Sequence, residues 1–138
     1  LAFEQLGGAA RCQKMALEYA KTRYAFGRPI GSFQAIKHKI VDMLVSADLA
    51  RSNCYYAAWA VENKTDIPVA AAAARVAATE AFEFCSRENI QVHGGIGFTW
   101  EADPHLFFKR SKLLALWLGS PPVWRERLLT ALDKKHAA

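Results

Sequence analysis

The sequence predicts an all-α fold, an up-and-down four-helix bundle with one extra short helix. Three observations predict it. Apolar residues recur at helical spacing over residues 36–61, glycine and proline clusters separate long helical runs by short loops, and no segment alternates apolar and polar residues as a half-buried strand does. With 138 residues, 52% of them hydrophobic, the chain is long enough for one domain with a core. We therefore expect a single helical-bundle domain over residues 1–138.

The first two helices are expected over residues 2 to about 24 and from Ser32 to about 62. One face of the first helix carries Phe3, Leu6, Ala10 and Leu17. The segment AFGRPIGS between the helices holds two glycines and a proline, which rule out a continuous helix, and Ser32 is the expected N-cap of the second. Apolar residues of the second helix are spaced alternately four and three apart, which is typical of an antiparallel bundle seam. They are Ile36, Ile40, Met43, Ala47, Ala50, Cys54, Ala57 and Val61.

Three further helices follow, separated by similar breaks. The segment NKTDIP at 63–68 is the expected turn before an alanine-rich helix. Asp103 and Ser120 are expected as N-caps of two shorter helices, because each directly precedes a proline suited to the first helical position. The expected bounds are about Val69 to Val92, Pro104 to Leu116 and Pro121 to Lys134.

Composition limits the function classes. A net charge of +5 suits a phosphate-bearing partner without distinguishing nucleic acid from a phosphorylated cofactor. A basic nucleic-acid-binding module therefore remains a competing hypothesis, although no helix carries a concentrated lysine and arginine stripe. No apolar segment approaches the roughly 20 residues that span a bilayer, so no membrane span is expected. Cys12, Cys54 and Cys85 form no C-x-x-C pair, which predicts buried reduced thiols in a cytosolic protein.

Several catalytic patterns are missing from the sequence. No histidine has a glutamate three residues before it, as di-iron helical bundles require, so no metal site is expected. Neither a G-x-S-x-G nucleophile elbow nor a Walker A segment occurs. The run GGIG at 94–97 is not a Rossmann fingerprint, because no strand is expected before it.

Two loops remain that combine glycine with cationic or amide residues. They are RYAFGRPIGSFQ at 23–34 and QVHGGIGF at 91–98. In an up-and-down bundle the first and third helices end at the same pole, so the two loops are expected to lie together. Glycine backbone and arginine side chains can form an anion cradle there, with Arg23, Arg28, Gln34 and Gln91 as candidates. The alternative is that both loops only cap helices, and spacing alone favours this alternative.

Three motifs resemble those of the acyl-CoA dehydrogenase family. The first, R-x-x-F-G-x-P-I-x-x-F-Q, extends from Arg23 to Gln34, and the second, Q-x-x-G-G-x-G-F-x-x-E, from Gln91 to Glu101. The third, H-L-F-x-K-R, begins at His105. The resemblance is to the carboxy-terminal helical domain of that family and covers essentially the whole chain.

The resemblance implies a flavoprotein that uses FAD to dehydrogenate an acyl-CoA thioester between its α and β carbons, in fatty acid or lipid catabolism. It implies that the helical and β domains of the family precede this domain in a longer enzyme, so the fragment alone is expected to be inactive. The implied assembly is a homodimer or tetramer of same-family subunits, and the implied electron acceptor is an electron-transfer flavoprotein. The expected location is the bacterial cytoplasm, with the mitochondrial matrix as the alternative.

The resemblance also assigns a cofactor site. In family members the segment matching 91–95 lies against the adenosine-diphosphate part of FAD bound by a neighbouring subunit, and the absent glycine side chains leave room for it. Segment 23–25 with Phe33 and Gln34 is similar to the part that holds the pyrophosphate and adenine end. The implied cofactor-binding residues are Arg23, Tyr24, Ala25, Phe26, Phe33, Gln34, Gln91, Val92, His93, Gly94 and Gly95.

The sequence departs from the family at the general base. In much of the family a glutamate precedes a Gly-Thr or Gly-Ser pair before the last helix, and Leu118 occupies that position here. Glu4 is a weak candidate for a base relocated to the first helix. Alternatively, the chain belongs to a heteromeric enzyme whose partner subunit supplies the base, or to a non-catalytic relative. Trp117 and Gly119 are candidates for substrate contact, whereas Trp124 is expected in the core.

Overall fold

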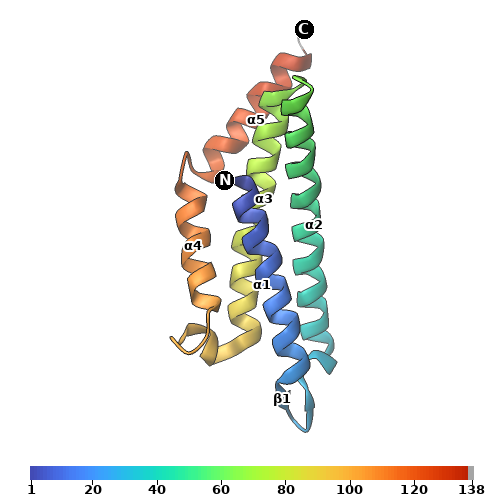
Figure 1. Ribbon diagram of the computed structural model, residues 1–138, viewed down its shortest axis with the longest axis vertical. Coiled ribbons are helices and arrows are strands. Elements are labelled where there is room, and N and C mark those ends of the chain that lie inside the picture. Colours follow the sequence, from blue (N-terminus) through green and yellow to red (C-terminus); the bar gives the residue numbers. More distant parts are fainter. Residues whose placement is uncertain (137–138) are drawn as a thin grey trace.

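The computed structural model describes residues 1–136 and confirms the all-α fold (Figure 1). Within these residues there are five α-helices, and three of them run side by side along the long axis. The remaining two fill the fourth position of the bundle one after the other, both packed against α3. The helices are α1 (Ala2–Thr22), α2 (Gln34–Glu62), α3 (Ile67–His93), α4 (Pro104–Leu116) and α5 (Pro121–His136).

A small hairpin follows α1, where the sequence predicted no strand. Strands β1 (Tyr24–Ala25) and β2 (Arg28–Pro29) pair antiparallel, and the short 3₁₀ helix η1 (Ile30–Ser32) leads into α2. Phe26 and Gly27 form the turn with φ angles of 55° and 79°, as the primed turns of tight hairpins require. Two-residue strands are too short to show an alternating pattern, which explains the missed element.

The structure places the three expected N-cap residues differently from one another, and within the described residues none of them is seen to make a side-chain capping bond. Ser32 does not cap α2, which begins at Gln34, because the Ser32 hydroxyl donates to the Pro29 carbonyl at 2.7 Å. Asp103 does occupy the N-cap position of α4, but its side chain makes no capping hydrogen bond. At the start of α5, the carbonyl of Ser120 accepts the Trp124 N–H at 3.2 Å. Fixed proline backbone therefore marks the starts of α4 and α5 more clearly than side-chain caps do.

Small residues bury α1 against the bundle. Its fully buried positions include Ala9, Cys12 and Ala16, whereas Phe3, expected on the buried face, is 48% exposed. The Phe3 ring meets Tyr55 of α2 edge-on instead, with centroids 5.6 Å apart. The predicted face is therefore confirmed at Leu6, which is buried, and at Leu17, which packs against the core, and it is wrong at Phe3.

The predicted seam of α2 is confirmed over most of its length and wrong at its end. Residues from Ile40 to Cys54 in the four-three pattern are buried, but Val61 is 57% exposed and Ala60 is buried in its place. A straight helix has 3.6 residues per turn, so a strict seven-residue pattern drifts by roughly 20° per heptad. After three heptads the drift moves Val61 off the contact face.

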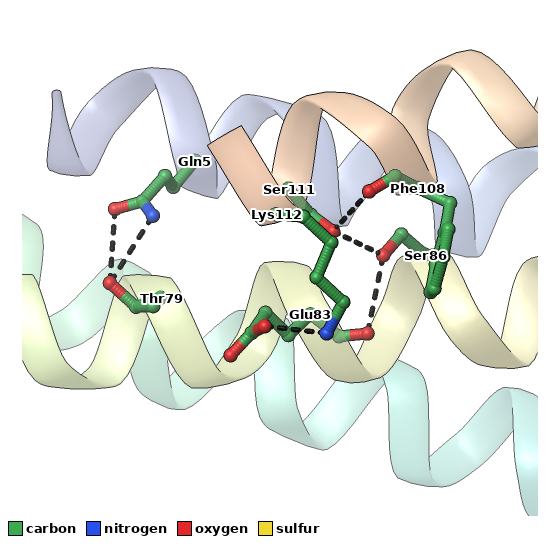
Figure 2. A network of polar contacts seen from close by, with 7 residues as sticks. All are labelled: Gln5, Thr79, Glu83, Ser86, Phe108, Ser111 and Lys112. Atoms are coloured by element: carbon green, nitrogen blue, oxygen red, sulfur yellow. Dashed lines mark hydrogen bonds and ion pairs between the residues drawn. The ribbon is translucent and has the colours of Figure 1, made fainter. Parts of the chain in front are cut away.

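Polar contacts join α3 to α4 both inside the bundle and at its surface (Figure 2). The Ser86 hydroxyl donates to the Ser111 hydroxyl at 2.9 Å between α3 and α4, and both residues are fully buried. Beside them, Lys112 of α4 donates to a carboxylate oxygen of Glu83 at 2.6 Å. The Ser86–Ser111 contact satisfies polar groups that burial alone would penalise, whereas the Lys112–Glu83 pair lies at the surface.

The three cysteines are buried and free, as predicted. Burial raises the pKa of the Cys12 and Cys85 thiols to about 12, so both remain protonated near neutral pH. In the described part of the chain, no cluster of three potential metal ligands occurs, and no helix is long and apolar enough to cross a membrane.

We predict that Gly8→Ala destabilises the protein. A Cβ at position 8 would lie 2.4 Å from the Cζ atom of the buried Phe82 ring, so the ring or the helix must shift. Overpacking of this kind costs about 1–3 kcal/mol. The matched control Gly7→Ala meets nothing within 4 Å and should stabilise α1 by about 0.5–1 kcal/mol. Urea unfolding followed by circular dichroism measures both, and equal stabilities would contradict the close approach of α1 and α3.

Candidate functional site

The two glycine-bearing loops lie at the same pole of the bundle, as predicted (Figure 1). An aromatic contact joins the two helices at this pole. The ring of Tyr19, in the last turn of α1, stacks on the ring of His93 at the end of α3, with centroids 4.2 Å apart and planes at 25°. Sequence reasoning missed Tyr19, whose position near the helix end was the only available signal.

The hairpin after α1 holds an apolar side chain in solvent. Phe26 is 95% exposed. Its backbone also has a positive φ of 55°, a conformation that costs a non-glycine residue roughly 1 kcal/mol or more. Two backbone bonds brace the hairpin, from Arg23 N–H to the Tyr19 carbonyl and from Ile30 N–H to the Arg23 carbonyl, both 2.8 Å. A strained turn that exposes a phenylalanine has the features of a contact surface.

Cationic and aromatic side chains gather at the base of this hairpin. The Arg28 guanidinium lies 4.1 Å from the centroid of the Phe33 ring, and Phe26 approaches the same ring edge-on at 6.2 Å. Next to Phe33, Gln34 is exposed, and its amide nitrogen lies 3.4 Å from Nε2 of His38. This group offers a positive charge, an amide and flat apolar faces, which together suit a nucleotide.

The three glycines of 91–98 are glycine for different reasons. Gly94 has φ +66°, which side-chain-bearing residues rarely adopt. Gly97 is packed inside, because a Cβ there would lie 3.1 Å from the Ile90 carbonyl oxygen. Gly95 has neither constraint: its φ is ordinary and a Cβ would meet nothing within 4 Å. Of the three, Gly95 therefore has no structural reason within the described chain, Gly94 has open space but a restricted φ, and Gly97 is required by packing.

The residues before these glycines divide between core and surface. Val92 is buried, so only its backbone is available to a ligand, whereas Gln91 is exposed. His93 is half-buried, and its Nδ1 atom lies 2.8 Å from the Asn89 carbonyl oxygen. Since a carbonyl can only accept, Nδ1 carries the proton and Nε2 of His93 is left as the second ring atom able to bind.

The loop that matches the family's catalytic-base position lies elsewhere, beyond the far end of α4. That helix has 13 residues and is roughly 20 Å long. No acidic residue occurs from Leu116 to Arg125. Leu118 is 64% exposed with φ +63°, and Trp117 is 53% exposed. Where much of the family has a glutamate, this chain therefore has an exposed apolar loop.

Glu4, the other carboxylate considered as a base, is held by an ion pair. Arg110 of α4 donates from Nε at 2.9 Å and from Nη2 to the same Oε1 atom of Glu4. The pair borders a hollow of about 430 Å³ lined by Arg110, Leu113, Leu116 and Trp117. An oxygen that accepts two guanidinium hydrogen bonds is poorly prepared to take a proton from a substrate.

Trp124, expected in the core, is only half-buried. Its indole N–H donates to the Leu118 carbonyl at 3.0 Å, and Arg127 lies 4.6 Å from its ring centroid. The ring also accounts for Gly119, which has φ +114° and whose Cβ would lie 3.2 Å from the indole nitrogen. Trp117 and Leu118 are therefore exposed to solvent, whereas Gly119 and Trp124 pack against each other and support the loop.

Comparison with known proteins gives the chain a family. The model of the family described as "Acyl-CoA dehydrogenase, C-terminal domain" matches residues 1–132. The chain belongs to the acyl-CoA dehydrogenase family. It is 50% identical over 121 residues to "Acyl-CoA dehydrogenase IpdE2" of Mycobacterium tuberculosis, a match that covers 88% of this chain and 36% of that protein.

Two solved structures of similar proteins agree with this membership. The Tcur3481-Tcur3483 steroid ACAD, G363A variant, superposes with a TM-score of 0.93 at 30% identity, over 99% of this chain and 38% of that one. The FAD complex of PigA gives 0.91 at 26% identity, over 96% and 35%. This chain thus spans little more than a third of the acyl-CoA dehydrogenase relatives named here.

Two neighbouring glycines provide a matched pair of stability predictions. Gly94→Ala forces a side chain into a positive-φ position and should lower the free energy of unfolding by about 1–3 kcal/mol. Gly95→Ala meets no atom and no φ restriction, so its stability should stay within about 0.5 kcal/mol of the original. Thermal unfolding of both variants is the measurement. A larger loss for Gly95→Ala than for Gly94→Ala would contradict the assigned reasons.

Proposed function

We propose that the chain is the carboxy-terminal domain of an FAD-dependent acyl-CoA dehydrogenase, an oxidoreductase that removes hydrogen from the α and β carbons of an acyl-CoA thioester. Family membership and relatives of that name support the proposal. The chain covers little more than a third of those relatives, so helical and β domains outside it would supply the flavin-ring contacts and much of the thioester site. The observation that carries the proposal is Gly95, which is open, exposed and not required by packing.

The glycine pole is proposed to bind the adenosine-diphosphate part of FAD held by a neighbouring subunit. Gly94 and Gly95 let the backbone approach a bulky dinucleotide, and Arg23 and Arg28 supply positive charge for the pyrophosphate. Amides from Gln34 and Gln91 can orient the ligand. The other proposed contacts are Tyr24, Ala25, Phe26, Phe33, Val92 and His93. When bound, the flavin supplies the hydride acceptor, and this chain's role is to bind and orient its distant end.

The proposed general base lies outside this chain. No carboxylate occupies the Leu118 loop, and Glu4 is paired with Arg110. The α proton would therefore be taken by a residue of another segment of the full-length protein or by a partner subunit. The joint name of the Tcur3481-Tcur3483 steroid ACAD supports the alternative of a heteromeric partner subunit. A non-catalytic subunit is the other alternative.

The proposed partners follow from the reaction. They are an acyl-CoA substrate, further same-family subunits in a dimer or tetramer, and an electron-transfer flavoprotein as acceptor. Mycobacterial relatives support a bacterial protein, for which we propose a cytoplasmic location. A nucleic-acid-binding role is not favoured, because Arg23 and Arg28 lie at the proposed phosphate site and account for part of the positive charge.

The cofactor site is tested by flavin affinity. In the full-length protein, the double variant Arg23→Met with Gln91→Leu should raise the Kd for FAD at least about tenfold, because it removes a cation and an amide from the pyrophosphate site. Gly95→Ala should weaken FAD binding without loss of stability. The control Arg11→Met removes an exposed arginine from the middle of α1 and should retain flavin. Unchanged affinity in the double and Gly95 variants would exclude this pole as the site.

The base is tested by anaerobic titration of the full-length protein with acyl-CoA thioesters. Glu4→Gln should leave the rate of flavin bleaching within about twofold, because the ion-paired Glu4 is not the proton acceptor. A loss of about a hundredfold or more would instead identify Glu4 as the base. If the unchanged protein bleaches alone, the base lies in its own chain. If it bleaches only with a partner subunit, the heteromeric alternative is favoured.

A further inference from the structure

We propose that Arg75 is a positioning residue that holds the loop 117–119 in its strained conformation and thereby sets the affinity of the protein for its acyl-CoA thioester. The inference rests on the proposed function, because Trp117 and Gly119, the candidates for substrate contact, both lie in this loop. It concerns the junction between α4 and α5, away from the glycine loops, so its test can be separated from that of the flavin site.

Arg75 connects the central helix to the end of α4 through backbone carbonyls. It lies in α3 and is 4% exposed. Its Nη2 atom donates to the carbonyl of Leu114 at 2.6 Å and to that of Trp117 at 2.9 Å, with Ala115 further away at 3.4 Å. The last carbonyls of a helix have no hydrogen-bond partner within it, and a cation there also interacts favourably with the negative end of the helix dipole. One guanidinium therefore caps α4 and also binds the first residue of the following loop, Trp117.

The other half of the guanidinium is fixed by neutral groups. Nη1 of Arg75 donates to the Thr79 hydroxyl at 2.8 Å and to Oε1 of Gln5. Gln5 is fully buried in α1 and in turn donates to Thr79 at 3.2 Å (Figure 2). None of these hydrogen-bond acceptors is a carboxylate, and burial lowers the pKa of Arg75 from its ordinary value. A buried cation without a counter-ion is costly, and backbone carbonyls are its main compensation.

The loop that Arg75 holds is strained and clamped at two successive carbonyls. Leu118 adopts φ +63°, which is unfavourable for a leucine. Arg75 binds the carbonyl before it, and the indole N–H of Trp124 binds the Leu118 carbonyl at 3.0 Å. Donors from α3 and α5 thus fix the peptide groups on both sides of one left-handed residue. Strain persists only where the surroundings impose it, and here the two donors are the groups that do so.

The clamp determines what the domain presents at this surface. Trp117 and Leu118 are both more than half exposed, and Trp117 lines the same hollow as Leu113 and Leu116. Since Arg75 contacts the loop from inside the bundle, it shapes this apolar surface without touching a ligand. Its effect on the thioester is therefore indirect, through the placement of the Trp117 and Leu118 side chains.

The test uses the full-length protein with three variants and a matched control. Arg75→Met removes the donors while keeping a long apolar side chain, Arg75→Lys keeps a cation, and Trp124→Phe removes only the indole N–H. The control Arg125→Met deletes a surface arginine of α5 that pairs with Glu80 of α3 at 2.5 Å. Two quantities are measured: the Kd for an acyl-CoA thioester from the flavin absorbance change, and hydrogen exchange of the amides at 116–120.

Arg75→Met should raise the Kd roughly ten- to hundredfold at unchanged flavin content, and loop amides should exchange at least about tenfold faster. Arg75→Lys should have a Kd close to that of the unchanged protein. The Kd of Trp124→Phe should lie between those of the unchanged protein and Arg75→Met, and Arg125→Met should bind like the unchanged protein. If Arg75→Met fails to fold, the lysine and Trp124 variants decide. A lower Tm with unchanged Kd and unchanged loop exchange would overturn the proposal. If no form binds flavin or thioester, the proposed function and the affinity claim fail together, while loop exchange still decides whether Arg75 holds the loop.

Discussion

The tight burial of α3 by small side chains is the constraint on which the rest of the domain depends. Every other α-helix of the described chain packs against this one helix. Ala74, Ala78 and Ala81 of its core face are buried, and their small side chains let the neighbouring helices approach closely. At Gly8 of α1 the Phe82 ring leaves no room for even a Cβ atom. Close packing of this kind leaves no slack, so the two ends of α3 are placed rigidly relative to each other.

Each end of α3 serves a different part of the proposed enzyme. Its carboxy-terminal end carries His93 and the glycines that would meet the flavin of a neighbouring subunit. Near its start, Arg75 reaches across to α4 and fixes the loop at Leu118. In the proposed enzyme, one helix therefore carries residues of both the proposed cofactor surface and the proposed thioester surface. Under this proposal the domain contributes to binding although its Leu118 loop holds no carboxylate.

The sequence was sufficient to predict the order of the helices and the common pole of the two glycine loops, because glycine and proline mark where the helices end. It was also sufficient to predict the family, because the motifs are long. It misled where packing decides. Helical spacing placed Phe3 on the same face as Leu6, but Phe3 is exposed, and alanine and cysteine occupy the fully buried positions of α1. The role of Arg75 depends on carbonyls about 40 residues later, which no local pattern reveals. Gly95 and Gly97 look alike in the sequence, and only three-dimensional contacts separate the open one from the packed one.

The most direct test of this account is a structure of the full-length protein loaded with FAD. The account predicts that the adenosine-diphosphate part of the cofactor from a neighbouring subunit lies in van der Waals contact with Gly95, with Arg23 close to its pyrophosphate. A flavin-loaded structure in which residues 91–95 face solvent, or contact only protein, would contradict it.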